Sequence, residues 1–143
     1  MISPADAEAA RNAERRRFVV RALSWAFYSA LLLFMGLIRT GVIPKTGFRA
    51  TDKILHAVAF GGLAILVYRL SILIWPKKKT LWHATMGIVF STNFGILLEL
   101  LQLMTAYRCA EFADVVADFL GALLFTLLAV AFHWERPNRV FLS

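Results

Sequence analysis

Long apolar runs dominate this chain and predict helices that cross a membrane. A spanning helix needs about 20 mostly apolar residues, and four windows separated by short polar stretches approach or meet that length. The windows are Ala22–Ile38, Ile54–Trp75, Leu81–Met104 and Phe112–Trp134. The first window is marginal in length, whereas the other three are convincing. We therefore expect an all-α, polytopic membrane protein built as a four-transmembrane-helix bundle.

Composition supports this interpretation and limits what lies outside the bundle. The chain has 143 residues, of which 59% are hydrophobic, and a mean hydropathy of +0.66. These values are too apolar for a soluble domain of this size, which has a large surface to expose to water. We expect a basic N-terminal cytoplasmic tail over residues 1–21, one transmembrane domain over 22–134, and a short cytoplasmic C-terminal tail over 135–143. The N-terminal arginines before an apolar run also suit a signal peptide, but Gly36–Pro44 offers no clear cleavage site, which favours a retained anchor.

The positive charge predicts an orientation rather than a nucleic-acid partner. The net charge is +7, but the basic residues cluster beside the spans, as in membrane proteins that follow the positive-inside rule. If the chain starts in the cytoplasm, most of its basic residues lie on that side. The cytoplasmic set is Arg11, Arg15, Arg16, Arg17, Arg21, Arg69, Lys77, Lys78, Lys79, Arg136 and Arg139, and the opposite set is Arg39, Lys45, Arg49, Lys53 and Arg108. Both termini are therefore expected in the cytoplasm, and no nucleic-acid partner is expected.

The turn Trp75-Pro76-Lys77-Lys78-Lys79 marks the expected cytoplasmic side. Such a short link makes the second and third helices antiparallel neighbours. Its lysines have two interpretations that the sequence leaves open: an orientation signal, or a binding site for anionic lipid headgroups.

Polar residues gather at the opposite, outward end of the predicted bundle. Positions three or four apart share one face of a helix, and three helices each carry a polar face of this kind near that end. The candidate ligand-binding residues are Asp52, Lys53, His56, Glu99, Gln102, Arg108, Asp114 and Asp118. Gly95 and Gly121 lie on the same faces and would let the helices approach closely. The spacing predicts a polar pocket, a turn or two deep, that opens outward.

Glu99 is the best single indicator of a site. An ionisable side chain within an apolar span costs at least a few kcal/mol, so it rarely persists without a partner or a function. We expect Glu99 to lie within contact or one-water range of Arg108, His56 or Lys53.

Structural explanations compete for each residue. Asp52 suits a helix cap, Glu111 and Asp114 suit the positive N-terminal end of the fourth helix, and His56 suits a satisfied interior histidine. Buried Glu–Arg or Asp–Lys structural pairs would account for the deeper residues.

These residues resemble a known family, the VanZ-like membrane proteins. The matching segments run from about residue 51 to 125 and are Asp52-Lys53-x-x-His56-x-x-x-Phe60, Gly95-x-x-x-Glu99-x-x-Gln102 and Arg108-x5-Asp114-x3-Asp118-x2-Gly121. The family usually carries Asn where this chain has Asp118, which implies a different local charge.

The resemblance implies a multi-pass protein of the bacterial inner (plasma) membrane that acts at the cell envelope. The family's namesake is associated with low-level resistance to the glycopeptide teicoplanin. On this basis we expect the pocket to bind a polar headgroup. Membrane lipids, a lipid-linked glycan, a cell-wall precursor and a glycopeptide are the expected partners. Lys53 and Arg108 would meet phosphate or carboxylate.

Two other functions stay open. In an enzyme acting on a lipid-borne substrate, His56 or Glu99 would be the general acid or base, although the chain carries no established catalytic motif. In a scaffold or transporter subunit, the polar cluster would only hold the helices together. No cofactor and no metal is expected. A metal on His56, Glu99, Asp114 and Asp118 is conceivable, and such an oxygen-rich set would suit a hard cation better than zinc.

Overall fold

The described residues form an all-helical bundle. The computed structural model describes residues 3–38, 49–105 and 111–132. Within these ranges the elements are α1 (Pro4–Leu37), α2 (Arg49–Ile74), α3 (Thr80–Leu103) and α4 (Phe112–Ala131), with no strand. Each helix is long and apolar enough to cross a membrane. The predicted fold class and four spans are therefore confirmed.

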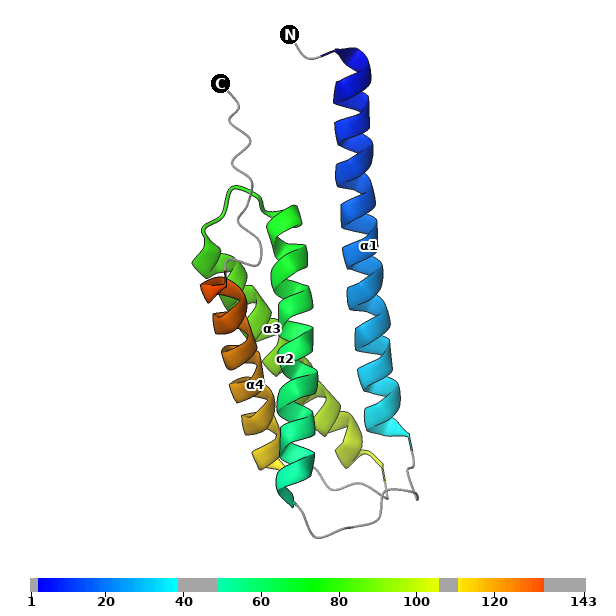
Figure 1. Cartoon of the computed structure of the whole chain (residues 1–143). Coiled ribbons are helices and arrows are strands. Elements are labelled where there is room, and N and C mark those ends of the chain that lie inside the picture. The colour runs from blue at the N-terminus through cyan, green and yellow to red at the C-terminus, as the bar shows by residue number, and fades with distance from the viewer. Residues whose placement is uncertain (1–2, 39–48, 106–110, 133–143) are drawn as a thin grey trace.

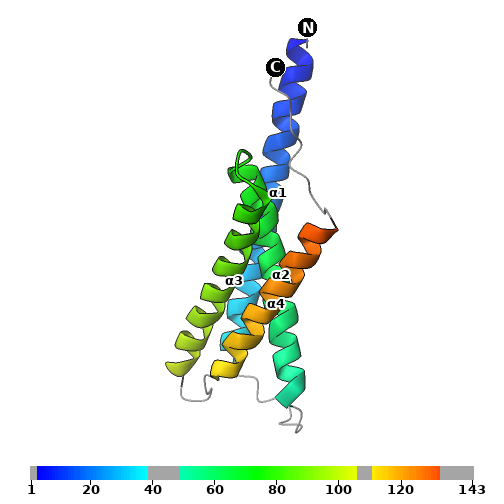
Figure 2. The same ribbon diagram turned by 90° about the vertical axis from the view of Figure 1, so that its left-hand side faces the viewer.

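The helices define two ends of the bundle (Figure 1). At one end, α1 and α3 finish while α2 and α4 begin, and we call it the site end because Asp52, Glu99 and Asp114 lie there. At the other end, α1 begins, α4 finishes, and the turn Trp75–Lys79 joins α2 to α3, so we call it the turn end. Figure 2 shows α4 crossing α2 obliquely, while α1 runs along the α2–α3 side. Which end faces the cytoplasm stays a prediction.

α1 differs from the expected short span that follows a tail. It is one helix of 34 residues, which at about 1.5 Å per residue is far longer than the roughly 30 Å hydrocarbon core. Its N-terminal part projects beyond the rest of the bundle (Figure 1). The side chain of Ser3 caps the helix by accepting from the Asp6 amide, and Pro4 occupies the first turn. A good cap, a well-placed proline and an alanine-rich segment explain why the helix starts so early.

Close helix contacts, rather than large apolar layers, hold α2, α3 and α4 together. Helices gain little from the hydrophobic effect within lipid, so small residues that permit close packing are favoured. Gly121 of α4 lies directly against the backbone of Ala57 in α2, where any side chain would overlap it. Gly95 of α3 faces the side chain of Asp118 in α4. The close approach predicted at Gly95 and Gly121 is thus confirmed.

α1 is attached to this unit through a few specific contacts. The Tyr28 hydroxyl donates to the carbonyl of Ala59 in α2 at 2.9 Å, and Arg21 donates to the carbonyl of Arg69 at 2.9 Å. The Trp25 ring meets Phe90, halfway along α3, edge to face. Trp25 therefore lies well within α1, whereas Trp75 and Trp82 lie at the turn end.

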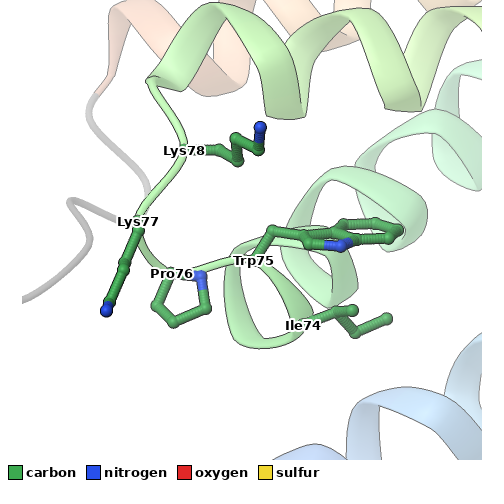
Figure 3. Close-up of a pocket in the computed structure, with 5 residues that line it drawn as sticks. All are labelled: Ile74, Trp75, Pro76, Lys77 and Lys78. Atoms are coloured by element: carbon green, nitrogen blue, oxygen red, sulfur yellow. The ribbon is translucent and has the colours of Figure 1, made fainter.

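The turn end is exposed and basic. Trp75 and Trp82 pack edge to face with ring centroids 6.4 Å apart, and the Lys78 ammonium lies 5.1 Å from the centroid of the Trp82 ring. An open cavity of 240 Å³ is lined by Ile74, Trp75, Pro76, Lys77 and Lys78 (Figure 3). The predicted tight turn between antiparallel neighbours is confirmed, and its aromatic and basic side chains suit a membrane surface.

Candidate functional site

Charged side chains from α2 and α4 form one network at the site end. The Lys53 ammonium lies 3.0 Å from a carboxylate oxygen of Asp114 and 3.2 Å from one of Glu111. Asp114 is buried, whereas the side chain of Glu111 is half exposed. Because Glu111 is the N-cap residue of α4 and Asp114 lies in its first turn, Lys53 links the start of α2 to the start of α4. The predicted meeting of these two helix faces is confirmed for these residues.

One turn deeper, His56 and Asp118 form a second link between the same helices. His56 Nδ1 lies 2.9 Å from a carboxylate oxygen of Asp118, and Asp118 is completely buried. The ring of Phe60 stacks on His56 with centroids 6.0 Å apart, because the two residues are four positions apart on α2. His56 is thus held on one side by a carboxylate and on another by an aromatic ring.

Gly95 creates the space that Asp118 occupies. A Cβ atom at Gly95 would overlap the carboxylate of Asp118, so only glycine allows α3 and α4 to enclose that carboxylate. One oxygen of Asp118 bonds His56, and the other is buried without a hydrogen-bond partner among the described residues.

Glu99 is buried but only half satisfied. It is 6% exposed, and one carboxylate oxygen accepts the backbone N–H of Glu111 at 3.1 Å. Its other oxygen has no hydrogen-bond partner among the described residues. Its charge interacts with those of Asp114, His56 and Asp118. No direct hydrogen bond joins Glu99 to Lys53 or His56, because Lys53 is held by two other carboxylates and His56 by Asp118. The expectation that one of them lies within contact or one-water range of Glu99 stays a prediction. The third expected partner, Arg108, lies outside the described residues.

Gln102 does not join the network. Its side-chain amide donates to the carbonyl of Gly36 in α1 at 2.9 Å, and the residue is almost fully buried. Gln102 therefore ties α3 to α1. This contact could not be predicted from the sequence, because the backbone carbonyl that accepts the hydrogen bond belongs to α1, whose position the polar pattern does not encode.

Asp52 completes the group of candidate residues at the exposed edge of the site. The capping interpretation of Asp52 is wrong, because α2 begins at Arg49 and Asp52 lies within its first turn. Asp52, His56 and Asp114 each offer a possible metal-ligating atom, and these three atoms lie within 4.8 Å of one another. Asp52 is exposed, His56 is partly buried and Asp114 is buried, so the group runs from the surface inward.

A second contact that involves a histidine, between His83 and Ser71, lies at the turn end and was not predicted. His83 of α3 is completely buried, and its Nδ1 lies 3.0 Å from the hydroxyl of Ser71 in α2. Its Nε2 has no hydrogen-bond partner among the described residues. The sequence feature that could have predicted this contact is a serine near the end of one helix and a histidine near the start of the next, because a short turn joins the two helices. His83 and His56 lie at opposite ends of the bundle and do not contribute to one site.

Comparison with known proteins identifies the family of this chain and one relative. A family model described as VanZ/LLP1 matches residues 2–133, nearly the whole chain. This chain belongs to the VanZ/LLP1 family. A protein of the fission yeast Schizosaccharomyces pombe, described as the uncharacterized protein C11E3.10, is 27% identical over 125 residues. The similarity covers 86% of this chain and 72% of the yeast protein. No solved structure matches the chain.

In this VanZ/LLP1 protein, the three segments that carry the sequence resemblance meet at one end of the bundle. The first segment supplies Lys53, His56 and Phe60, the second supplies Gly95 and Glu99, and their helices contact the third segment at the start of α4. The chain is a multi-pass membrane protein. The relative in fission yeast shows that similarity to this chain extends to a eukaryotic protein.

Proposed function

We propose that this VanZ/LLP1 protein binds the polar headgroup of a lipid-borne molecule at the site end. Glu99 is the observation that carries the proposal. A carboxylate that is 94% buried, with one oxygen lacking any partner in the described part of the chain, is costly for a bundle whose polar groups serve only to hold helices together. A hydroxyl or amide donor on a bound headgroup would satisfy that oxygen.

The contacts that the polar side chains at the site end already make indicate which groups remain to bind a headgroup. Lys53 already contacts two carboxylates, and the amide of Gln102 already bonds α1. These side chains are therefore poor candidates for a direct contact to phosphate or to a sugar. The free oxygen of Glu99 and the exposed carboxylate of Asp52 are acceptors. They suit the hydroxyl and amide donors of a lipid-linked glycan, a cell-wall precursor or a glycopeptide.

The location of the protein is part of the same proposal. The distribution of basic residues favours the turn end in the cytoplasm and the site end outward. Exposed apolar side chains cover all four helices, so a lipid tail has a surface to lie against while its headgroup reaches the site end. We place the protein in a bacterial plasma membrane, where such binding would act at the cell envelope and could bear on glycopeptide resistance.

Replacement of Glu99 with glutamine tests this proposal. The variant keeps the volume of the side chain but replaces one carboxylate oxygen with an NH2 donor and removes the charge. Wild-type protein and Glu99→Gln would be reconstituted in nanodiscs made from a bacterial polar lipid extract, and retained lipids would be identified by native mass spectrometry. We expect the wild type to retain a polar-headgroup lipid that Glu99→Gln loses at an unchanged melting temperature.

His83→Gln is the matched control, because His83 is also a buried polar residue but lies at the turn end. It should retain the same lipid as the wild type. If Glu99→Gln retained that lipid in equal amount, or if the wild type retained none selectively, the site-end cluster would be a structural feature and the proposal would fail.

A further inference from the structure

The site end concentrates carboxylates from three helices, several of them buried. The carboxylates are Asp52, Glu99, Glu111, Asp114 and Asp118, and the basic side chains that contact them within the described part of the chain are Lys53 and His56. Glu99 and Asp118 each keep one buried oxygen without a hydrogen-bond partner among the described residues. Buried charge without compensation is destabilising, so a bound cation would stabilise this cluster.

The geometry around His56 points to where that cation lies. Nδ1 of His56 is engaged by the buried carboxylate of Asp118, which leaves Nε2 as the nitrogen open to a ligand. Metal-binding histidines typically have this arrangement, in which a carboxylate fixes one ring nitrogen and orients the other toward the ion. Phe60 stacks on the ring and fixes its plane. The histidine is therefore held in place before any ligand arrives.

Two carboxylates complete a three-ligand set with His56. The ligand atoms offered by Asp52, His56 and Asp114 lie within 4.8 Å of one another. Ligands about 2.1 Å from an ion lie up to roughly 4.2 Å apart, so a small contraction would bring all three into contact. Lys53 engages one oxygen of Asp114, and the other oxygen is available to an ion.

A second observation points to a ligand independently of this set. Glu99 is 94% buried, and one of its carboxylate oxygens has no hydrogen-bond partner among the described residues. Its other oxygen is held at the start of α4 by the N–H of Glu111, three residues before Asp114. A cation near Asp114 would offset this buried charge directly or through a bound water.

We propose that Asp52, His56 and Asp114 bind a divalent transition-metal ion. One imidazole nitrogen and two carboxylate oxygens suit Mn²⁺ or Zn²⁺ better than Ca²⁺ or Mg²⁺, which take oxygen ligands. Three protein ligands leave coordination positions open. This inference deepens the proposed function, on which it rests for the role of the ion: the open positions would accept phosphate oxygens of a lipid-linked headgroup, a task for which Lys53 is not free.

Mn²⁺ binding to the purified full-length chain in detergent, without added lipid, tests the site. Electron paramagnetic resonance measures free and bound Mn²⁺, and electron spin-echo modulation detects coupling to a histidine nitrogen. We expect one Mn²⁺ per chain with nitrogen coupling, which Zn²⁺ displaces and Ca²⁺ does not displace at equal concentration. Absence of stoichiometric Mn²⁺ binding would overturn the inference, as would nitrogen-free binding that Ca²⁺ displaces equally well.

Asp52→Asn and Glu111→Gln form a matched pair for this experiment. Both residues are exposed carboxylates at the site end, and each substitution removes one negative charge without opening the core. If Asp52 is a ligand, Asp52→Asn should weaken Mn²⁺ binding about tenfold or more, whereas Glu111→Gln should change it less than about threefold. Equal weakening in both would mean that diffuse negative charge attracts the ion, which would contradict a three-ligand site.

The nanodisc measurement separates this inference from the proposed function. If the wild type retains its lipid after chelation with EDTA and binds no Mn²⁺, the ion site fails while headgroup binding stands. If Mn²⁺ binds as expected but no lipid is selectively retained, the ion site stands and headgroup binding fails. His56→Gln, which can still hydrogen-bond Asp118, should lose the nitrogen coupling. Persistence of that coupling would exclude His56 as the ligand.

Discussion

Two histidines, one buried at the turn end and one partly buried at the site end, stand in different electrostatic environments. His83 at the turn end contacts the hydroxyl of Ser71, a neutral group that itself bonds the carbonyl of Tyr68. His56 at the site end contacts the carboxylate of Asp118, and further carboxylates lie around it. Both histidines join neighbouring helices, so the structural need to link helices can be met by a neutral hydrogen bond.

The comparison indicates that a charged pair is not the only way in which two helices of this bundle are joined. Buried ion pairs give little net stability, because desolvation of the charges offsets their attraction. The turn end places its lysines at the surface, where water or lipid headgroups solvate them, whereas the site end buries Asp114, Asp118 and Glu99. Arrangements that contribute little stability but concentrate charge within a membrane are typical of binding sites and ion sites.

The largest expected difference between the two ends is their accessibility to a reagent outside the cell membrane. Cys109 is the single cysteine and lies between α3 and α4, which places it in the chain segment that connects helices at the site end. A membrane-impermeant thiol reagent should label Cys109 in intact spheroplasts. A cysteine introduced at the turn end, Lys78→Cys in a Cys109→Ser background, should be labelled only after lysis. The reverse pattern would invert the orientation.

The second prediction compares the loss of stability when each of the two histidines loses its hydrogen-bond partner. Asp118→Ala removes the charge partner of His56 and should lower the free energy of unfolding by about 3 kcal/mol. Ser71→Ala removes a neutral partner of His83 and should lower it by about 1 kcal/mol. Denaturant titration of both purified variants in detergent measures the difference. Equal losses would remove the electrostatic distinction between the two ends.

Asp118→Asn sharpens this result, since asparagine is the residue expected at this position in the family. Its carbonyl oxygen still accepts from His56 and its volume is unchanged. We expect a loss well below that of Asp118→Ala. A loss as large as that of alanine would mean that the negative charge, and not the hydrogen bond, holds His56.

A smaller difference is expected between alanine substitutions at two glycines near the site end. A methyl group at Gly95 would overlap the carboxylate of Asp118, which is completely buried and bonded to His56, whereas one at Gly36 would meet only side-chain carbons of Leu98. Gly95→Ala should therefore lower the melting temperature and weaken lipid retention, while Gly36→Ala should change both only slightly. Thermal unfolding monitored by tryptophan fluorescence gives the first quantity. A harmless Gly95→Ala would show that Asp118 is not confined as the structure describes.

The spans were predictable because an apolar run of membrane length has few alternative structures. The window Phe112–Trp134 begins at the same residue as α4, and Leu81–Met104 is shifted by one residue from α3. The early start of α1 was missed because a hydropathy window registers apolar length. The helix begins instead with the cap at Ser3, before the apolar residues.

The site was predictable in outline but not in its pairings. Helical spacing placed Lys53, His56, Asp114 and Asp118 on facing sides of α2 and α4, as the structure shows. It could not choose the partner of Lys53, because that depends on the register between two helices. It also could not find the bond between Glu99 and the N–H of Glu111, since every residue but proline offers such a donor.

The most direct test of the functional claim is an experimental density map of the site end in a lipid environment. A crystal structure grown from a lipid mesophase, with Mn²⁺ present and anomalous data collected, would serve. We expect non-protein density within hydrogen-bond distance of the free oxygen of Glu99, and an anomalous peak between Asp52, His56 and Asp114. A map without such density, in which residues of the chain itself satisfy Glu99 and the surrounding carboxylates, would contradict both proposals and assign the cluster to holding the helices together.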